Sequence, residues 1–191
     1  MTPGSSTERN GRRLAWQERG AGPVLLLLQG YAGAAADWDP RLLTALAGRF
    51  RVVCPDPRGM GASTFGDDDE PLTVGSLAAD ALAVLDALDA PDAVVAGWSM
   101  GGFVAQTLTV AAPTRVRGLA LIGTDAGGPT AVRADPAVWA RLLDDSGPPH
   151  EQATRLLHLL FPPAMATAVD DEVGGLVAEG RARLDRRALR A

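Results

Sequence analysis

The sequence predicts an α/β fold organised around a mostly parallel, twisted sheet. Two continuous apolar runs, Val24–Leu28 and Ala93–Ala96, have the composition of strands buried on both faces. Segments with the apolar spacing of helices lie between these runs and further strand candidates. Parallel strands need crossover connections of this kind, so the alternation indicates right-handed crossovers with helices flanking the sheet.

The segments around Val24–Leu28 complete the first half of the sheet. Residues 1–10 are polar and are predicted to form an N-terminal tail. Residues 12–19 mix apolar and polar side chains, as an edge or hairpin strand does. Residues 37–48 have the spacing of a helix, and residues 51–54 form a short strand that ends at a proline.

The second half begins with a loop and continues with helices and a strand. Residues 57–71 are rich in Gly, Asp and Pro, and the acidic run 67–70 within them is more typical of a solvated loop than of a cation site. Thr73 is suited to be the N-cap of the next helix. Another helix ends at Pro113, and residues 116–122 form a further strand.

From Gly127 onward the pattern changes to helices alone. Three segments with helical spacing follow, without a convincing strand: residues 138–143, 151–160 and 173–190. The predicted division of the chain is therefore a polar tail, an α/β core and a helical region: 1–10, 11–126 and 127–191.

Composition excludes several chemistries before any motif is considered. The 191 residues carry a formal charge of −5, whereas a sequence-independent grip on nucleic acid requires clustered cations. All 18 cationic residues are Arg, which excludes a phosphate-loop Lys, a Schiff-base Lys and a Ser–Lys dyad. One cysteine, Cys54, excludes a disulfide framework, and two histidines leave little room for a metal site. Neither a cofactor nor a metal is predicted.

We expect a cytoplasmic protein without a membrane partner. The first ten residues lack the apolar run of a secretory signal. The longest strongly apolar stretch, Val24–Leu28, is too short to span a bilayer.

The strongest chemical signal is the pentapeptide Gly97-Trp98-Ser99-Met100-Gly101, which matches G-x-S-x-G between a buried strand and a helix. Such a turn strains the serine backbone and leaves no room for side chains at the flanking glycines. It lifts the Ser99 hydroxyl above the carboxyl end of the sheet, where open α/β folds bind ligands. The helix behind it directs backbone N–H groups, including that of Met100, toward developing negative charge. The alternative interpretation is a plain glycine-rich turn.

Two other loops support this interpretation. Gln29-Gly30-Tyr31 follows the first buried strand, and the Tyr31 N–H is the candidate second donor to an oxyanion; the alternative is an ordinary turn at a strand end. The segment from Asp56 to Ser63, with the sequence DPRGMGAS, is predicted to be scaffold, its Asp and Arg tying the loop by a charge-assisted hydrogen bond.

These three motifs, in this order and spacing, resemble the α/β-hydrolase superfamily, and most closely bacterial carboxylic-ester hydrolases and lactonases with a helical cap. The resemblance covers residues 10–190. It implies a nucleophilic Ser99, an oxyanion hole formed by the N–H groups of Tyr31 and Met100, and a cap that begins near Gly127. It also implies hydrolysis of a small ester or lactone without a cofactor.

The sequence departs from the family pattern in three places. Gln29 and Met60 stand where the family usually has histidine. The family's triad acid and histidine normally follow two strands after the cap, whereas this chain ends at Ala191, so we expect those last strands to be missing. The alternative function is therefore a truncated, noncatalytic chain that binds a ligand or a partner.

Few residues are available to complete a triad. Asp125, just after the last strand, is the candidate acid, and otherwise it caps a turn. His158, or less favourably His150, is the candidate base, although histidines in such settings are more often packed or exposed than catalytic. The apolar cap residues favour a small, fairly apolar substrate, unless they only pack the cap on the sheet: Trp139, Leu142, Leu143, Leu157, Leu160 and Phe161.

Missing strands would also leave residues 116–122 at the edge of the sheet. Leu119, Leu121 and Ile122 would then be poorly covered, and exposed edges pair with other chains. We expect self-association or a complementing chain at this edge. A nucleotide-binding α/β domain is disfavoured, because residues 30–33 lack the glycine spacing of a dinucleotide loop.

Overall fold

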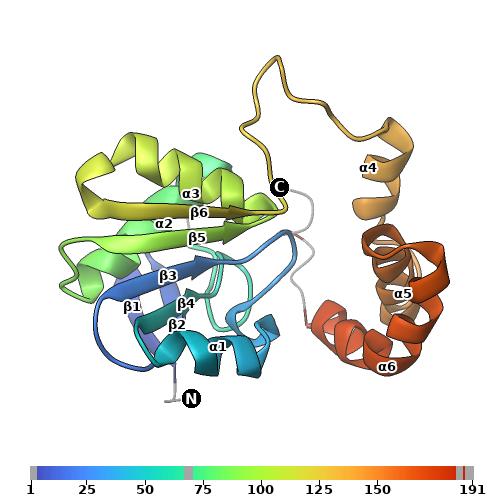
Figure 1. The fold of residues 1–191 in the computed structure, drawn as a ribbon, viewed down its shortest axis with the longest axis horizontal. Coiled ribbons are helices and arrows are strands. Elements are labelled where there is room, and N and C mark those ends of the chain that lie inside the picture. The colour runs from blue at the N-terminus through green and yellow to red at the C-terminus, as the bar shows by residue number, and fades with distance from the viewer. Residues whose placement is uncertain (1–3, 67–70, 184–186, 188–191) are drawn as a thin grey trace.

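The computed structural model describes residues 4–66, 71–183 and 187. Six strands form one twisted sheet in the order β1-β2-β4-β3-β5-β6, as Figure 1 shows. The strands β4, β3, β5 and β6 are parallel, while β1 and β2 run antiparallel at one edge. Their bounds are β1 Ser5–Arg9, β2 Arg12–Arg19, β3 Val24–Leu28, β4 Arg51–Pro55, β5 Ala93–Trp98 and β6 Val116–Ile122.

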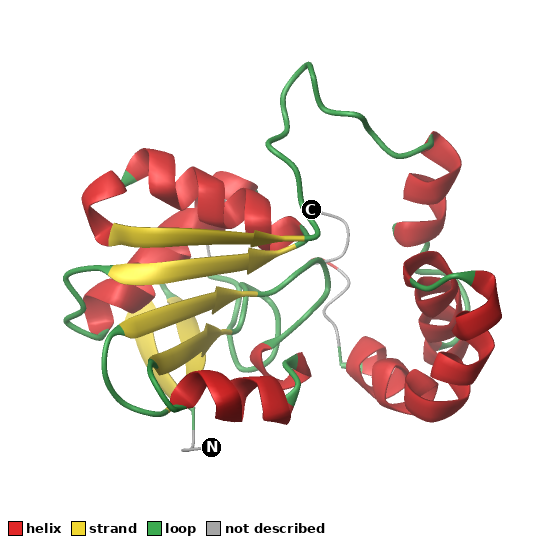
Figure 2. Cartoon of the chain, viewed as in Figure 1, coloured by secondary structure: helices red, strands yellow, loops and turns green. Residues whose placement is uncertain are grey.

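Helices occupy both faces of the sheet and one end of the molecule (Figure 2). Six α-helices and two short 3₁₀ turns are described: η1 Ala35–Asp37, α1 Pro40–Ala47, α2 Val74–Ala87, α3 Met100–Ala111, η2 Pro113–Arg115, α4 Pro136–Leu142, α5 Pro149–Leu160 and α6 Pro163–Ala182. The predicted N-cap is confirmed, since the Thr73 hydroxyl accepts a hydrogen bond from the Ser76 backbone. The predicted α/β class with a mostly parallel sheet is likewise confirmed.

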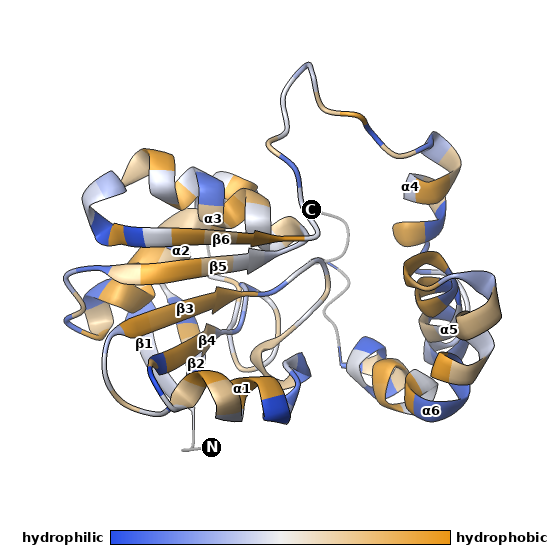
Figure 3. Cartoon of the chain, viewed as in Figure 1, coloured by the Kyte–Doolittle hydropathy of each residue, from blue (hydrophilic) through white to orange (hydrophobic). Residues whose placement is uncertain are grey.

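The core forms on both faces because β3 is apolar at every position (Figure 3). Leu26 and Leu28 face α2 and α3, whereas Leu25 and Leu27 face α1. Cys54 packs on the α1 side as a core residue. Burial, assisted by the nearby Asp56 carboxylate, raises the pKa of its thiol to about 12, so Cys54 is not a nucleophile near neutral pH.

The predicted tail over residues 1–10 is wrong in one respect. Ser5–Arg9 form β1, which pairs antiparallel with β2 and adds a strand to the sheet. The connection is Asn10-Gly11, and both residues have positive φ, 50° and 71°. This dipeptide is a strong signal for a two-residue hairpin, because both central residues of such a turn need positive φ. The segment was predicted to be a tail because it is polar. A strand at the edge of a sheet also tolerates polar side chains, so polarity does not distinguish the two.

Two predicted helix boundaries also require correction. The first helix begins at Pro40 instead of residue 37, because Asp39 is its N-cap and Asp37 belongs to η1. The last begins at Pro163, ten residues before the predicted start, and its predicted end at residue 190 lies outside the described residues. The acidic run 67–70 lies outside them as well.

Helices α4, α5 and α6 lie across from the carboxyl ends of the parallel strands, as a separate layer (Figure 1). Helices α5 and α6 pack closely against each other. Ala153 and Leu157 of α5 and Ala166 of α6 are buried. In the described residues after Ile122 only helices and loops occur. None of the described helices is long and apolar enough to cross a membrane.

Candidate active site

Ser99 stands at the sharp turn between β5 and α3. Its backbone has φ 54° and ψ −121°, a strained conformation for a residue with a side chain. The turn is held on both sides: the Ser99 N–H donates to Ile122 O at 2.9 Å, and the Gly102 N–H donates to Ser99 O at 2.9 Å. Strain maintained by neighbouring hydrogen bonds is typical of functional sites.

Close packing explains the glycines on either side of Ser99. A Cβ at Gly97 would lie 2.2 Å from the carbonyl oxygen of Gly101. A Cβ at Gly101 would lie 2.2 Å from the carbonyl oxygen of Leu28, at the end of β3. Both distances are far below van der Waals contact, so any other residue would displace the turn.

The loop after β3 lies directly against this turn. A Cβ at Gly30 would be 3.2 Å from the Ser99 Cβ. The Gln29 side chain is buried and holds the loop from within: its Oε1 accepts from the Gly30 N–H at 3.1 Å, and its Nε2 donates to Ala34 O at 3.4 Å. Gln29 is thus a brace for the loop that contains Tyr31.

A cleft of about 640 Å³ opens over these two loops, a volume within the usual range for small-molecule sites. Gly30, Tyr31 and Met100 form one side, and Leu143 of the cap region contributes to the lining. Burial raises the pKa of the Tyr31 hydroxyl, while the charge of Arg181 in α6 acts in the opposite direction. The cap therefore approaches the cleft closely enough to influence Tyr31.

The Asp and Arg side chains of the loop after β4 both form hydrogen bonds that hold the loop, but they do not pair with each other. The Asp56 carboxylate accepts from the backbone N–H groups of Ala35 at 2.8 Å and Ala62 at 2.9 Å. Arg58 instead forms two hydrogen bonds of 2.9 Å with Asp80 of α2, and both side chains are buried. The sequence feature that could have indicated a buried partner for Asp80 is its position as a lone charge on the apolar face of a helix.

Neither candidate base is brought to Ser99. In the described part of the chain the Ser99 hydroxyl has no hydrogen-bond partner. His150 and His158 are exposed on α5 and line a separate hollow of about 590 Å³, made of cap residues alone. That hollow includes Arg141 and Arg155 but no residue of the turn around Ser99.

Asp125, the candidate acid, closes a turn after β6. Its carboxylate accepts from the Gly127 N–H at 2.5 Å, and its backbone carbonyl accepts from Gln106 Nε2 at 2.8 Å. The side chain is exposed to solvent, so the turn-capping alternative describes its contacts in this structure. No cluster of three potential metal ligands occurs among the residues described.

Most of the apolar cap residues do not reach the cleft. Leu157 is buried within the cap, whereas Trp139 and Leu160 are about half exposed. Of the six predicted cap residues, Leu143 is the one that lines the cleft. Packing within the cap therefore accounts for part of this set, and one member lines the cleft.

A family model described as the alpha/beta hydrolase fold matches residues 23–183. The chain belongs to the α/β-hydrolase family. Among the relatives of this hydrolase-fold chain is a protein of Azorhizobium caulinodans provisionally named carbamate hydrolase RutD. It is 38% identical over 151 residues, which represent 78% of this chain and 55% of that protein. The chain thus spans about half the length of this relative.

Solved structures agree with the family assignment. A hydrolase from Pseudomonas aeruginosa PA01 superposes with a TM-score of 0.76 at 32% identity, covering 98% of this chain and 70% of that one. The N-acyl homoserine lactonase AidH, solved with N-butanoyl homoserine, gives a TM-score of 0.76 at 25% identity, covering 98% of this chain and 67% of that one.

Proposed function

We propose that Ser99 is the nucleophile of a hydrolase that acts on a small carboxylic ester or lactone. The observation that supports this most is the strained Ser99 backbone between two glycines that admit no side chain. The names of two relatives are consistent with it, since carbamate hydrolase and lactonase both denote cleavage of an acyl–heteroatom bond. No cofactor is needed for this chemistry.

In the proposed reaction the Ser99 Oγ attacks the carbonyl carbon, and the carbonyl oxygen takes up negative charge. The backbone N–H groups of Met100 and Tyr31 donate to that oxygen, and the positive end of α3 adds to its stabilisation. The alkoxide takes up the Ser99 proton; from an ester it leaves as the alcohol, and from a lactone it stays attached to the acyl group as a hydroxyl. Water then releases the acid and restores the Ser99 hydroxyl. A base must carry that proton, and neither His150 nor His158 contacts Ser99 in this structure.

Covalent labelling with a fluorophosphonate probe, read by intact mass, tests the role of Ser99. We expect one adduct on the wild-type chain and none on Ser99→Ala, with circular dichroism confirming that both are folded. His158→Gln and His150→Gln then locate the base: loss of labelling in one of them assigns it. A folded wild-type chain that the probe does not label would contradict the proposal.

The second candidate is a noncatalytic α/β-hydrolase chain that binds a ligand or a partner. The observation that favours it is that both histidines line a hollow that shares no residue with the cleft lined by Tyr31 and Met100. It predicts that the folded chain resists the probe while the cleft still binds small esters. Saturable binding of p-nitrophenyl butanoate without turnover, followed by NMR, would establish this alternative.

A further inference from the structure

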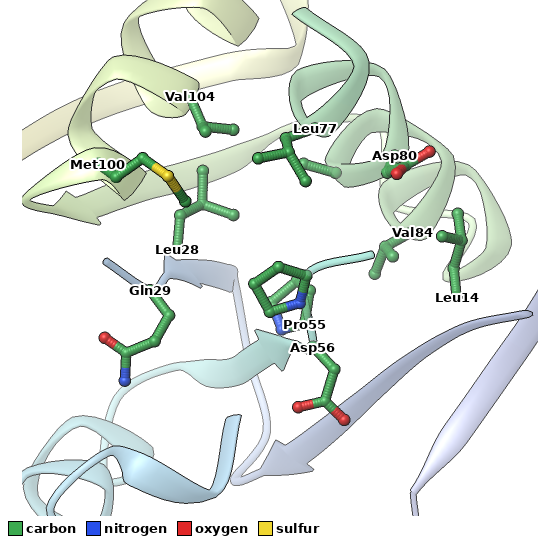
Figure 4. A pocket seen from close by; sticks show the side chains of 12 residues that line it. Leu14, Leu28, Gln29, Pro55, Asp56, Leu77, Asp80, Val84, Met100 and Val104 are labelled. Atoms are coloured by element: carbon green, nitrogen blue, oxygen red, sulfur yellow. The ribbon is translucent and has the colours of Figure 1, made fainter. Parts of the chain in front are cut away.

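A second, smaller cavity of about 40 Å³ lies behind Met100, inside the core (Figure 4). Its walls come from β3 and helices α2 and α3, through Leu28, Leu77, Val84 and Val104 among others. These wall residues are almost completely buried, so the cavity extends into the core. Pro57, Leu77 and Met100 line both this cavity and the cleft beside the loop after β3. Met100 therefore borders both spaces.

The surface of this cavity is mostly apolar. Three polar residues contribute to its wall, and Figure 4 shows the side-chain ends of Gln29 and Asp56 directed away from the group around Met100. Their polar atoms are engaged elsewhere: Gln29 with the loop after β3, and Asp56 with two backbone N–H groups. Asp80 is engaged by Arg58. A cavity of this kind suits an apolar group and offers little to an ordered water.

We propose that this cavity receives the apolar end of the substrate's acyl chain, and that Met100 sets the chain length admitted. The inference rests on the proposed function. If the Met100 N–H holds the carbonyl oxygen, the chain on the same carbonyl carbon begins beside the Met100 side chain. The alcohol must depart before water can enter, whereas the acyl group stays on Ser99. A cavity that extends into the apolar core suits the part that stays.

Size limits the chain that fits. One water-sized group needs about 10–15 Å³ of such volume, so the cavity holds about three methylene-sized groups. Each methylene transferred from water into an apolar cavity raises kcat/KM about fourfold. The wild-type chain is therefore expected to prefer short acyl chains, with kcat/KM rising per methylene until the cavity is filled and falling beyond that length.

The kinetic test uses p-nitrophenyl esters from acetate to decanoate. Met100→Ala joins the two spaces, and we expect the optimum to move to longer esters, by about fourfold in relative kcat/KM for each added methylene that fits. Val104→Leu fills the cavity and should move the optimum to shorter esters; Val84→Ile replaces it if that variant does not fold. Val110→Ala is the control, because Val110 is exposed on α3 and lines neither the cleft nor the cavity. An optimum that Met100→Ala and Val104→Leu both leave unchanged would overturn the proposal.

A second series separates the acyl side from the alcohol side. Alkyl acetates, from ethyl to octyl, vary only the alcohol, and Met100→Ala should leave their relative kcat/KM unchanged. A shift in this series in place of the acyl series would assign the cavity to the leaving group and contradict our inference.

A binding measurement keeps the cavity separate from the chemistry. In a Ser99→Ala background, the affinity for 1-butanol, 1-hexanol and 1-octanol is measured by ligand-observed NMR, with and without Met100→Ala or Val104→Leu. Tighter binding of the longer alcohols on Met100→Ala, with weaker binding on Val104→Leu, supports the cavity even if no ester is hydrolysed. Hydrolysis that follows acyl length without any change in alcohol binding would refute the cavity assignment and leave the role of Ser99 intact.

Discussion

Gly101 shows how a single residue can control the geometry of the turn at Ser99. The carbonyl oxygens of Leu28 and Gln29 lie 2.2 Å and 2.5 Å from the position that a Cβ would occupy. Because both are backbone atoms, neither can move away by changing a rotamer. We expect Gly101→Ala to destabilise the chain by about 1–3 kcal/mol and to abolish fluorophosphonate labelling. Thermal unfolding and intact mass measure the two effects.

Gly75→Ala is the matched control for that substitution. Gly75 lies in the first turn of α2, and an added Cβ would be 3.6 Å from the Thr73 Oγ1, an ordinary contact. Removing backbone freedom from a helix should stabilise the chain by about 0.5–1 kcal/mol, without any effect on labelling. A similar loss of labelling in both variants would show that the turn is not uniquely sensitive to Gly101.

At the level of elements, a buried ion pair attaches the loop after β4 to α2. Arg58 and Asp80 form two parallel hydrogen bonds, and Arg58 is 2% exposed. The Asp80 carboxylate faces two buried guanidinium groups, Arg58 at 2.9 Å and Arg12 at 3.8 Å. Asp80→Asn removes this negative charge from beside both, so it should lower the free energy of unfolding by about 3–5 kcal/mol. The loop also carries Met60 of the cleft, so ligand binding should weaken together with stability. Denaturant unfolding with a parallel binding titration measures both quantities.

The pair between Arg117 and Asp92 provides a control of the same chemistry at the surface. Its N···O distance is 2.9 Å, but the Arg117 side chain is 60% exposed. Solvent screens such a pair, so Asp92→Asn should cost less than about 1 kcal/mol. If Asp80→Asn cost no more than Asp92→Asn, the buried pair would not be the attachment that we describe.

For the molecule as a whole, the two edges of the sheet differ sharply. The β1 edge is short and polar, with the sequence SSTER, which discourages pairing with other chains. The β6 edge is apolar from Gly118 to Ile122, and Leu121 and Ile122 are 43% and 51% exposed. The sequence analysis predicted this exposure, because it placed residues 116–122 at the edge of the sheet. Self-association or a complementing chain at the β6 edge therefore stays a prediction.

We expect the purified chain to self-associate in a concentration-dependent way, as measured by size-exclusion chromatography with light scattering. Leu121→Arg places a charge on the β6 edge and should yield a monomer. Val110→Arg is the control, because Val110 is 84% exposed on α3 but does not belong to a strand edge. A wild-type chain that stays monomeric at all concentrations would contradict self-association and leave a complementing chain as the remaining partner.

The sequence by itself determined the parallel strands and most of the helices between and after them. The spacing and composition of apolar residues along the chain located the parallel strands. A strand buried on both faces must be apolar throughout, as Val24–Leu28 is. The sequence also located Ser99, because the turn between β5 and α3 depends on residues that are adjacent in the chain. Local rules therefore sufficed for these features, and even the missed strand β1 carried a local signal at Asn10-Gly11.

Only the tertiary structure decided which distant residues meet. Arg58 pairs with Asp80 and not with Asp56, although Asp56 is nearer in sequence. His158 was the candidate base for Ser99, but it lines a hollow of the cap that contains no residue of the turn around Ser99. The cavity behind Met100 arises from strands and helices that close around it. Contacts of this kind depend on how elements pack in three dimensions, and residue spacing along one chain carries no record of that packing.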